Sequence, residues 1–178
     1  MKNILILPLT ALTMLFLSGC LFSTQQHPTL FYDLQLPEVV KTDAKFVISS
    51  VDNDTPARSR MLYRQQNNRI IQDSYHCWVQ PPERMFQRYM TLAYPVKGAL
   101  QEMTGIRVTI TAFEFDRVSH QAVLAIKYAL KKDHKIRSGS FLLREKITSD
   151  TPDEFAAAMN RAIRKAGSML AEAAAEKP

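Results

Sequence analysis

Three segments in the second half of the chain constrain the fold more than any other feature. The segment 106–112 alternates Ile, Val, Ile and Ala with Arg and Thr, which predicts a half-buried strand. The segment 123–130 is apolar on both faces apart from Lys127, so we place it centrally in a sheet. The segment 138–147 predicts a third consecutive strand. Because the links between these strands are short and polar, the sequence predicts an antiparallel meander.

A long amphipathic helix follows the meander. Thr151 is a helix-capping residue, Pro152 suits the first helical position and Glu154 completes a capping box. From Phe155 to Leu170, apolar residues recur every three or four positions. This spacing predicts a helix that buries one continuous stripe.

The first half of the chain adds shorter elements. Four more strands are predicted, at 31–36, 46–51, 62–66 and 69–79. Asn67 and Asn68 tolerate positive φ and suit a hairpin turn between the last two strands. An amphipathic stripe over 82–103 predicts a helix that Pro95 kinks or splits in two and that Gly105 ends. The predicted fold class is α+β: a largely antiparallel sheet of about six strands with two amphipathic helices packed on it.

The N-terminal segment has the three parts of a secretory signal. Lys2 supplies positive charge, an apolar run starts at Ile4, and Leu17-Ser18-Gly19-Cys20 looks like the lipobox of a bacterial lipoprotein. The apolar run is shorter than the roughly 20 residues of a spanning helix, although an uncleaved helical anchor is the alternative. We expect three parts: a signal peptide at 1–19, a lipidated tether at 20–29 and a single domain at 30–178.

Acylation of Cys20 would determine where this domain works. Two or more acyl chains anchor a protein firmly, at about 0.8 kcal/mol per buried methylene. A tether over 21–29 reaches at most roughly 30 Å, at about 3.3 Å per residue, so the domain stays close to its membrane. Leu21 follows the cysteine where Gram-negative lipoproteins kept in the inner membrane usually carry Asp. We therefore expect the periplasmic face of the outer membrane, with membrane lipids contacted through acylated Cys20.

Cysteine content and charge restrict the partners further. Cys20 and Cys77 are the two cysteines of the sequence, so acylation of Cys20 leaves Cys77 without an intramolecular disulfide partner. The formal net charge of +6 would suit nucleic acid, but export separates the chain from that partner. Anionic lipid headgroups or an acidic protein face fit better, and ordinary solvated faces are the alternative.

Residues for catalysis or metal binding are not grouped in this sequence. His76 and Cys77 are neighbours in a predicted strand, so they point to opposite faces, and Cys77 is more typical of a packed thiol than of a nucleophile. Glu114 and Asp116 face the same way, but at a strand end such a pair is usually solvated. We therefore predict no enzymatic activity, no metal and no cofactor.

Trp78, Pro81 and Pro82 form the more suggestive group. An aromatic residue beside a rigid turn is typical of an interface anchor. The alternative is that Trp78 fills the junction between hairpin and helix. Together with Tyr63 and Arg64, these residues are the candidate partner interface.

An ordered set of short motifs extends over residues 30–170. The motifs are Met61-Leu62-Tyr63-Arg64, Asn68-Arg69, Tyr75, Trp78-Val79-Gln80-Pro81-Pro82, Ala112-Phe113-Glu114-Phe115 and the stretch 155–162. In this order and spacing they resemble the ABC-type transport auxiliary lipoproteins, which are partners of lipid-transport systems built around a mammalian-cell-entry (MCE) protein. Pro95 departs from the usual helix followed by a variable loop.

The resemblance implies a non-catalytic domain at the outer membrane. It would help an inner-membrane permease, its cytoplasmic ATPase and an MCE protein to move lipids between membranes. A homo-oligomeric ring that receives the MCE assembly is also implied. The alternative function is that of a structural or assembly lipoprotein that binds a different secretion or envelope-maintenance complex.

Overall fold

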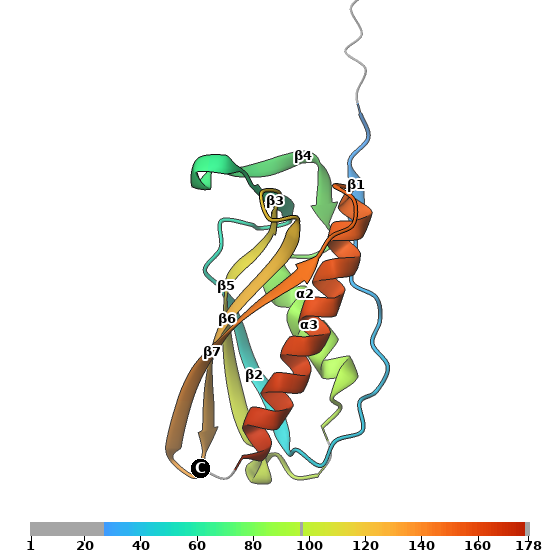
Figure 1. Cartoon of the computed structure of the whole chain (residues 1–178). Coiled ribbons are helices and arrows are strands. Elements are labelled where there is room, and N and C mark those ends of the chain that lie inside the picture. The colour runs from blue at the N-terminus through green and yellow to red at the C-terminus, as the bar shows by residue number, and fades with distance from the viewer. Residues whose placement is uncertain (1–26, 97, 177–178) are drawn as a thin grey trace, which may run out of the picture.

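The computed structural model describes residues 27–96 and 98–176, which form a mixed sheet with two α-helices on one face (Figure 1). This confirms the predicted α+β class and the two amphipathic helices. The sheet has seven strands and is partly parallel, whereas the sequence predicted fewer strands in largely antiparallel order. The predicted signal peptide, Cys20 and most of the tether lie outside the described residues.

The described elements follow one another in this order: β1 (Leu30–Tyr32), β2 (Phe46–Asn53), β3 (Arg60–Arg64), η2 (Gln66–Asn68), β4 (Ile70–Trp78), α2 (Pro82–Ala93), η3 (Leu100–Glu102), β5 (Thr104–Asp116), β6 (Gln121–Lys132), β7 (Lys135–Lys146) and α3 (Pro152–Ala175). Within this part of the chain, no helix has both the length and the hydropathy needed to cross a membrane.

The long strand β5 joins the two halves of the sheet. One edge pairs with β6, and β6 pairs with β7, so the predicted antiparallel meander is confirmed. The other edge of β5 pairs in parallel with β2 and, at its far end, with β3. A register shift between Ile110 and Ala112 changes which residues face the core: Ile110 is buried before it, and Phe113 and Phe115 after it. The regular alternation predicted through Ala112 is therefore wrong by one residue.

The strand predicted over 31–36 is shorter than expected. After Tyr32 the backbone leaves the sheet, and there the Asp33 carboxylate accepts a hydrogen bond from the amide of Leu34 and pairs with Arg88 of α2. Leu34 is still buried in the core. Residues 33–45, which we call the strap, then run alongside the helices to β2 (Figure 1).

The first helix ends before Pro95. A residue that precedes proline disfavours helical geometry, and Tyr94 has φ −126° and ψ 71° at the end of α2. The predicted helix over 82–103 is therefore one helix, Pro82–Ala93, followed by the 3-10 turn η3. Gly105, expected to end that helix, instead lies within β5.

The closing helix α3 begins at Pro152 with Thr151 as its N-cap, as predicted: the Thr151 side chain accepts a hydrogen bond from the Glu154 amide at 3.3 Å. The other half of the predicted capping box does not form, because the Glu154 carboxylate accepts a hydrogen bond from the Thr148 hydroxyl and the Thr151 amide donates to the Ser149 carbonyl.

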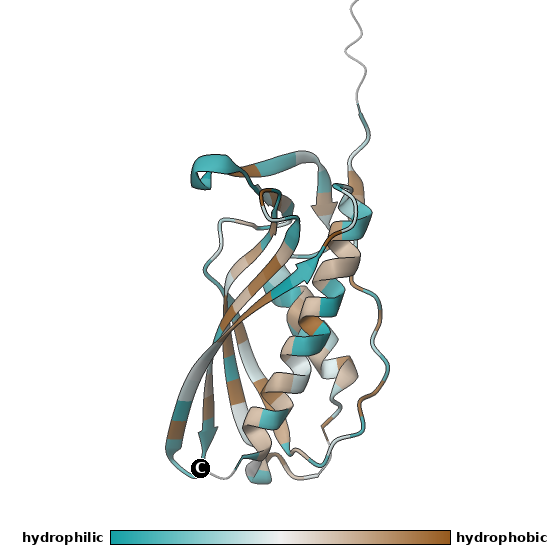
Figure 2. Cartoon of the chain, in the orientation of Figure 1, coloured by the Kyte–Doolittle hydropathy of each residue, from teal (hydrophilic) through white to brown (hydrophobic). Residues whose placement is uncertain are grey.

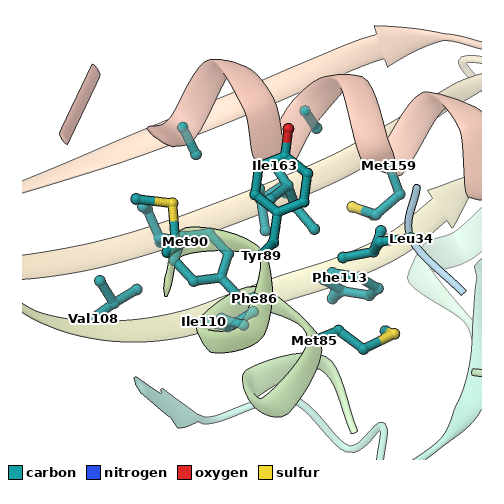
Figure 3. Packing of buried hydrophobic residues seen from close by; sticks show 14 of the residues in the cluster. Leu34, Met85, Phe86, Tyr89, Met90, Val108, Ile110, Phe113, Met159 and Ile163 are labelled. Carbon is teal, nitrogen blue, oxygen red and sulfur yellow. The ribbon is translucent and has the colours of Figure 1, made fainter. Parts of the chain in front are cut away.

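The apolar stripe of α3 packs against α2 and the sheet, and Figure 3 shows Met159 and Ile163 among the side chains of α2 and β5. Gly167 lies where the two helices approach: a Cβ there would be 2.9 Å from Cε2 of Tyr94. The core thus depends on a small residue at this position of α3.

Candidate partner-binding surface

The strand β4 bends sharply (Figure 1); Tyr63 and Arg64 of β3 pair with β4 before this bend, and Trp78 follows it. The antiparallel pairing of β3 with β4 is irregular here. Between the pairs Leu62↔Gln72 and Arg60↔Cys77, β4 runs from 72 to 77 whereas β3 runs only from 62 to 60, so β4 has extra residues that bulge out of the pairing. The Asp73 carboxylate fills this irregularity, since Oδ1 accepts the amides of Tyr75 at 2.8 Å and His76 at 2.9 Å. Past the bend, β4 pairs in parallel with β1.

The bend also contains a side-chain pair. Oδ2 of Asp73 lies 2.8 Å from Nδ1 of His76. Partial burial acts to raise the pKa of Asp73, but its hydrogen bonds with Tyr75 and His76 outweigh burial and lower this pKa below its ordinary value of 3.8. Asp73 is thus an ionised structural residue.

Trp78 follows the bend and is fully buried, with 0% of its surface exposed. Its ring meets Phe113 and Phe155 edge-on, with centroid separations of 5.3 Å and 5.4 Å. The indole Nε1 has no hydrogen-bond partner among the described residues. Trp78 therefore fills the junction between the hairpin, β5 and α3 and has no free surface for a partner.

Tyr63 belongs to the same buried junction. It is 3% exposed and packs against Phe115 and Phe155, while the Arg117 guanidinium lies 4.2 Å from its ring centroid. Burial, and then the nearby Asp73 carboxylate, raise the pKa of the Tyr63 hydroxyl well above its usual range. The hydroxyl thus stays protonated inside the domain.

Arg64 is the more accessible member of the pair Tyr63-Arg64. Its side chain is 33% exposed, and Nε lies 2.5 Å from Oε1 of Glu114. The hydrogen bond to Glu114 raises the pKa of Arg64. The prediction that Glu114 is solvated is wrong, because the parallel pairing of β3 with the end of β5 covers its carboxylate.

The two prolines begin α2. The carbonyl of Pro81 accepts the amides of Arg84 at 3.0 Å and Met85 at 3.1 Å, and Pro82 is the first helical residue and is buried. Pro81 is partly exposed. Of the five predicted interface residues, the structure thus leaves Arg64 and Pro81 with accessible surface, and their role in partner binding stays a prediction.

The strap supplies exposed apolar side chains that the sequence did not reveal as a surface. Leu36 is 76% and Val39 60% exposed. They lie along a cleft of about 430 Å³ that Tyr89 and Ala93 of α2 also line. The Val40 amide donates to the carbonyl of Ala93 at 2.8 Å, which holds the strap against α2. The available signal was the apolar residues Leu36, Val39 and Val40 in a stretch without strand or helix periodicity.

No metal-binding arrangement was found in the described ranges 27–96 and 98–176: no three or more His, Cys, Asp or Glu side chains gather there. Cys77 is a buried free thiol.

Comparisons with known proteins concern both sequence and fold. A family model described as "ABC-type transport auxiliary lipoprotein component" matches residues 53–171, from the end of β2 into α3. No curated protein matches the sequence.

Two crystal structures share the fold. One, of an uncharacterized protein, has a TM-score of 0.69 and 14% identity, covering 83% of this chain and 99% of that chain. The other, protein XCC0632 from Xanthomonas campestris of the family DUF330, has a TM-score of 0.67 and 14% identity, covering 79% and 92%. At this identity the similarity concerns the fold alone.

Proposed function

The chain belongs to the family of ABC-type transport auxiliary lipoprotein components, and we propose that it is a lipid-anchored, non-catalytic subunit of an intermembrane lipid-transport system. In this proposal, acylated Cys20 holds the domain at the periplasmic face of the outer membrane. The domain docks with an MCE-domain protein, whose inner-membrane permease and ATPase drive transport. A ring of several copies could form the docking platform.

The family match is the observation that supports the proposal most strongly. It spans β3, the bent β4, both helices and the meander, so it concerns most of the folded domain rather than a single motif. The lipobox Leu17-Ser18-Gly19-Cys20, at positions that the match does not include, supports the anchor independently.

The arrangement of the domain is compatible with docking away from the anchor. The chain enters the domain at the end formed by β1 and the start of α3 (Figure 1). The 24 residues of α3 then run to the opposite end, a distance of about 36 Å at about 1.5 Å per residue. If the entry end faces the membrane, the opposite end points into the periplasm.

Crosslinking in native membranes tests this function. An affinity-tagged full-length chain, crosslinked before solubilisation, is expected to recover an MCE protein together with its permease. A matched sample from cells without crosslinker measures background recovery. Clean isolation of the chain without an MCE protein, or with subunits of another envelope complex, would overturn the proposal.

A further inference from the structure

The end of the domain farthest from β1 contains a pocket of about 350 Å³ between α3 and the β6–β7 hairpin. Apolar side chains line its inner part: Leu130 from the hairpin, and Ala173 and Ala174 from the last turns of α3. Ile136 borders the pocket, but it pairs with Lys131 and is 69% exposed, so its side chain lies on the outer face of the hairpin. This volume lies within the range of sites that hold small molecules or parts of them, roughly 300–1,000 Å³. The apolar lining suits a hydrocarbon chain.

Strand register places cationic side chains at the mouth of this pocket. Leu130 pairs with Arg137 and Lys132 pairs with Lys135, so these side chains share the helix side of the hairpin. Asp133 and His134, both with positive φ, form the two-residue turn that fixes this register. Figure 2 shows the hydrophilic tip of the hairpin near the end of α3.

The three cations at the mouth differ in their partners. Arg137 pairs with Glu176 at 2.8 Å and also donates to the carbonyl of Ala173, so it ties the hairpin to α3. Lys132 and Lys135 also line the pocket, and neither has an ion-pair partner within the described part of the chain. Their charge is available to an anion beside the apolar interior.

We propose that this pocket binds an anionic phospholipid, with part of an acyl chain against Leu130 and Ala174 and the phosphate at Lys132 and Lys135. An apolar interior with cations at its mouth is complementary to an amphipathic anion, and basic residues attract anionic headgroups. The inference deepens the proposed function and rests on it, because a domain anchored in a lipid-transport system has such lipids at hand. It places lipid contact at the end opposite the anchor.

Site-specific photocrosslinking in cells grown with radioactive phosphate tests the inference on the full-length chain. A photoreactive phenylalanine analogue replaces Ala174, which lines the pocket, or, as a control, Ala156, which is also a half-buried alanine of α3 but does not line the pocket. Labelled phospholipid is expected on the chain when the probe is at position 174 and not at 156. The acyl chains expected on Cys20 contain no phosphorus and add no label.

Charge-reversal variants test whether lipid capture depends on the lysines at the mouth of the pocket. Lys132→Glu with Lys135→Glu is expected to reduce capture at position 174 by about tenfold or more, since each basic residue near anionic lipid contributes on the order of fivefold. Lys127→Glu with Lys131→Glu changes the net charge equally on the outer face of β6 and is expected to leave capture unchanged. Equal labelling at 174 and 156, or equal loss in both double variants, would overturn the inference. If lipid capture fails in this way but the MCE protein is recovered normally from the same cells, the proposed lipid site is wrong and the proposed docking function is not.

Discussion

Arg64 and Glu114 form an ion pair across the junction of β3 and β5, with Nε and Oε1 2.5 Å apart and the Glu114 side chain only 8% exposed. The two residues are far apart in sequence and meet because the end of β5 pairs with β3. The pair therefore joins the N-terminal hairpin to the meander. A buried carboxylate of this kind depends on its partner, because an uncompensated buried charge is costly.

Arg64→Ala is expected to lower the free energy of unfolding by about 2 kcal/mol, because Glu114 keeps its buried position and loses its cation. Urea unfolding followed by circular dichroism measures this change. Glu102→Gln, which removes the partner of Lys45 in an exposed ion pair, is the control and should leave the unfolding midpoint unchanged. An Arg64→Ala chain with the wild-type midpoint would contradict the structural role of the pair.

The sequence predicted the regular elements well because their patterns are local. The Thr151 N-cap and the stripe of α3 depend on neighbours within the helix, and the meander depends on alternation and short links. The parallel pairings of β1, β2 and β3 involve residues distant in sequence, so nothing in the local pattern indicated them. The register shift near Ala112 escaped prediction for the same reason.

The candidate interface was harder to predict than the fold. The sequence shows that Trp78 stands beside a rigid Pro81-Pro82 turn, but this is compatible with an interface anchor and with a core residue. In the structure, Phe113 and Phe155 pack on the indole, which is the arrangement of a core residue. Both phenylalanines belong to elements distant in sequence, so the local sequence did not indicate this packing. The exposure of the strap residues Leu36 and Val39 depends on the path of the backbone after it leaves the sheet at Asp33. That path is also set by tertiary structure.

Substitution of Trp78 separates packing from partner binding. Trp78→Ala is expected to destabilise the fold by about 3–5 kcal/mol, the usual cost of removing a large buried aromatic side chain. Trp78→Phe retains most of the packing and should cost far less. Both variants lack the one tryptophan of the chain, so urea unfolding followed by circular dichroism compares their stability with that of the wild type. In the wild-type chain, Trp78 emission should shift to longer wavelength on unfolding. If Trp78→Phe folds normally but loses its partner in the crosslinking experiment, Trp78 contributes to binding as well.

Acid should weaken the bend in β4. The folded state lowers the pKa of Asp73 below its ordinary value of 3.8, so the ionised carboxylate stabilises the fold above the unfolded pKa. That stability is lost as the pH falls through the lower, folded pKa. We expect the unfolding midpoint to decrease below about pH 4, and Asp73→Asn to reduce this decrease.

The Asp73→Asn chain should retain part of the acid sensitivity, because the hydrogen bonds from Ser119 and Val118 outweigh burial and also lower the pKa of Asp116. Thermal unfolding at several pH values between neutral and acidic compares the two chains. Parallel pH profiles for wild type and Asp73→Asn would show that the Asp73 carboxylate does not stabilise the bend.

The helices α2 and α3 lie too close together at position 167 for a side chain larger than that of glycine. A Cβ there would lie 2.9 Å from Cε2 of Tyr94 and 3.1 Å from Sδ of Met90, so Gly167→Leu forces the helices apart. Overpacking of this kind typically costs about 1–3 kcal/mol. Gly105→Ala is a control for replacing a glycine that has room for a side chain, because its Cβ would meet only the Lys131 carbonyl at an ordinary 3.8 Å. Chemical denaturation of both variants should show a loss for Gly167→Leu alone, and equal midpoints would contradict this account of the helix contact.

Cys20→Ala tests whether anchoring and folding are separate properties. The described domain begins at residue 27 and its core cluster at Leu34, so the domain of this variant should unfold at the wild-type midpoint. Without the thiol no acyl chain can attach, and we expect the chain to disappear from the outer-membrane fraction and transport to fail. Membrane fractionation and mass spectrometry of the intact protein measure location and acylation, and Cys77→Ala, which removes a buried thiol but keeps the anchor, is the control. Because the proposed contribution of this domain is its placement at the membrane, full transport by a folded but unacylated Cys20→Ala chain would contradict that role.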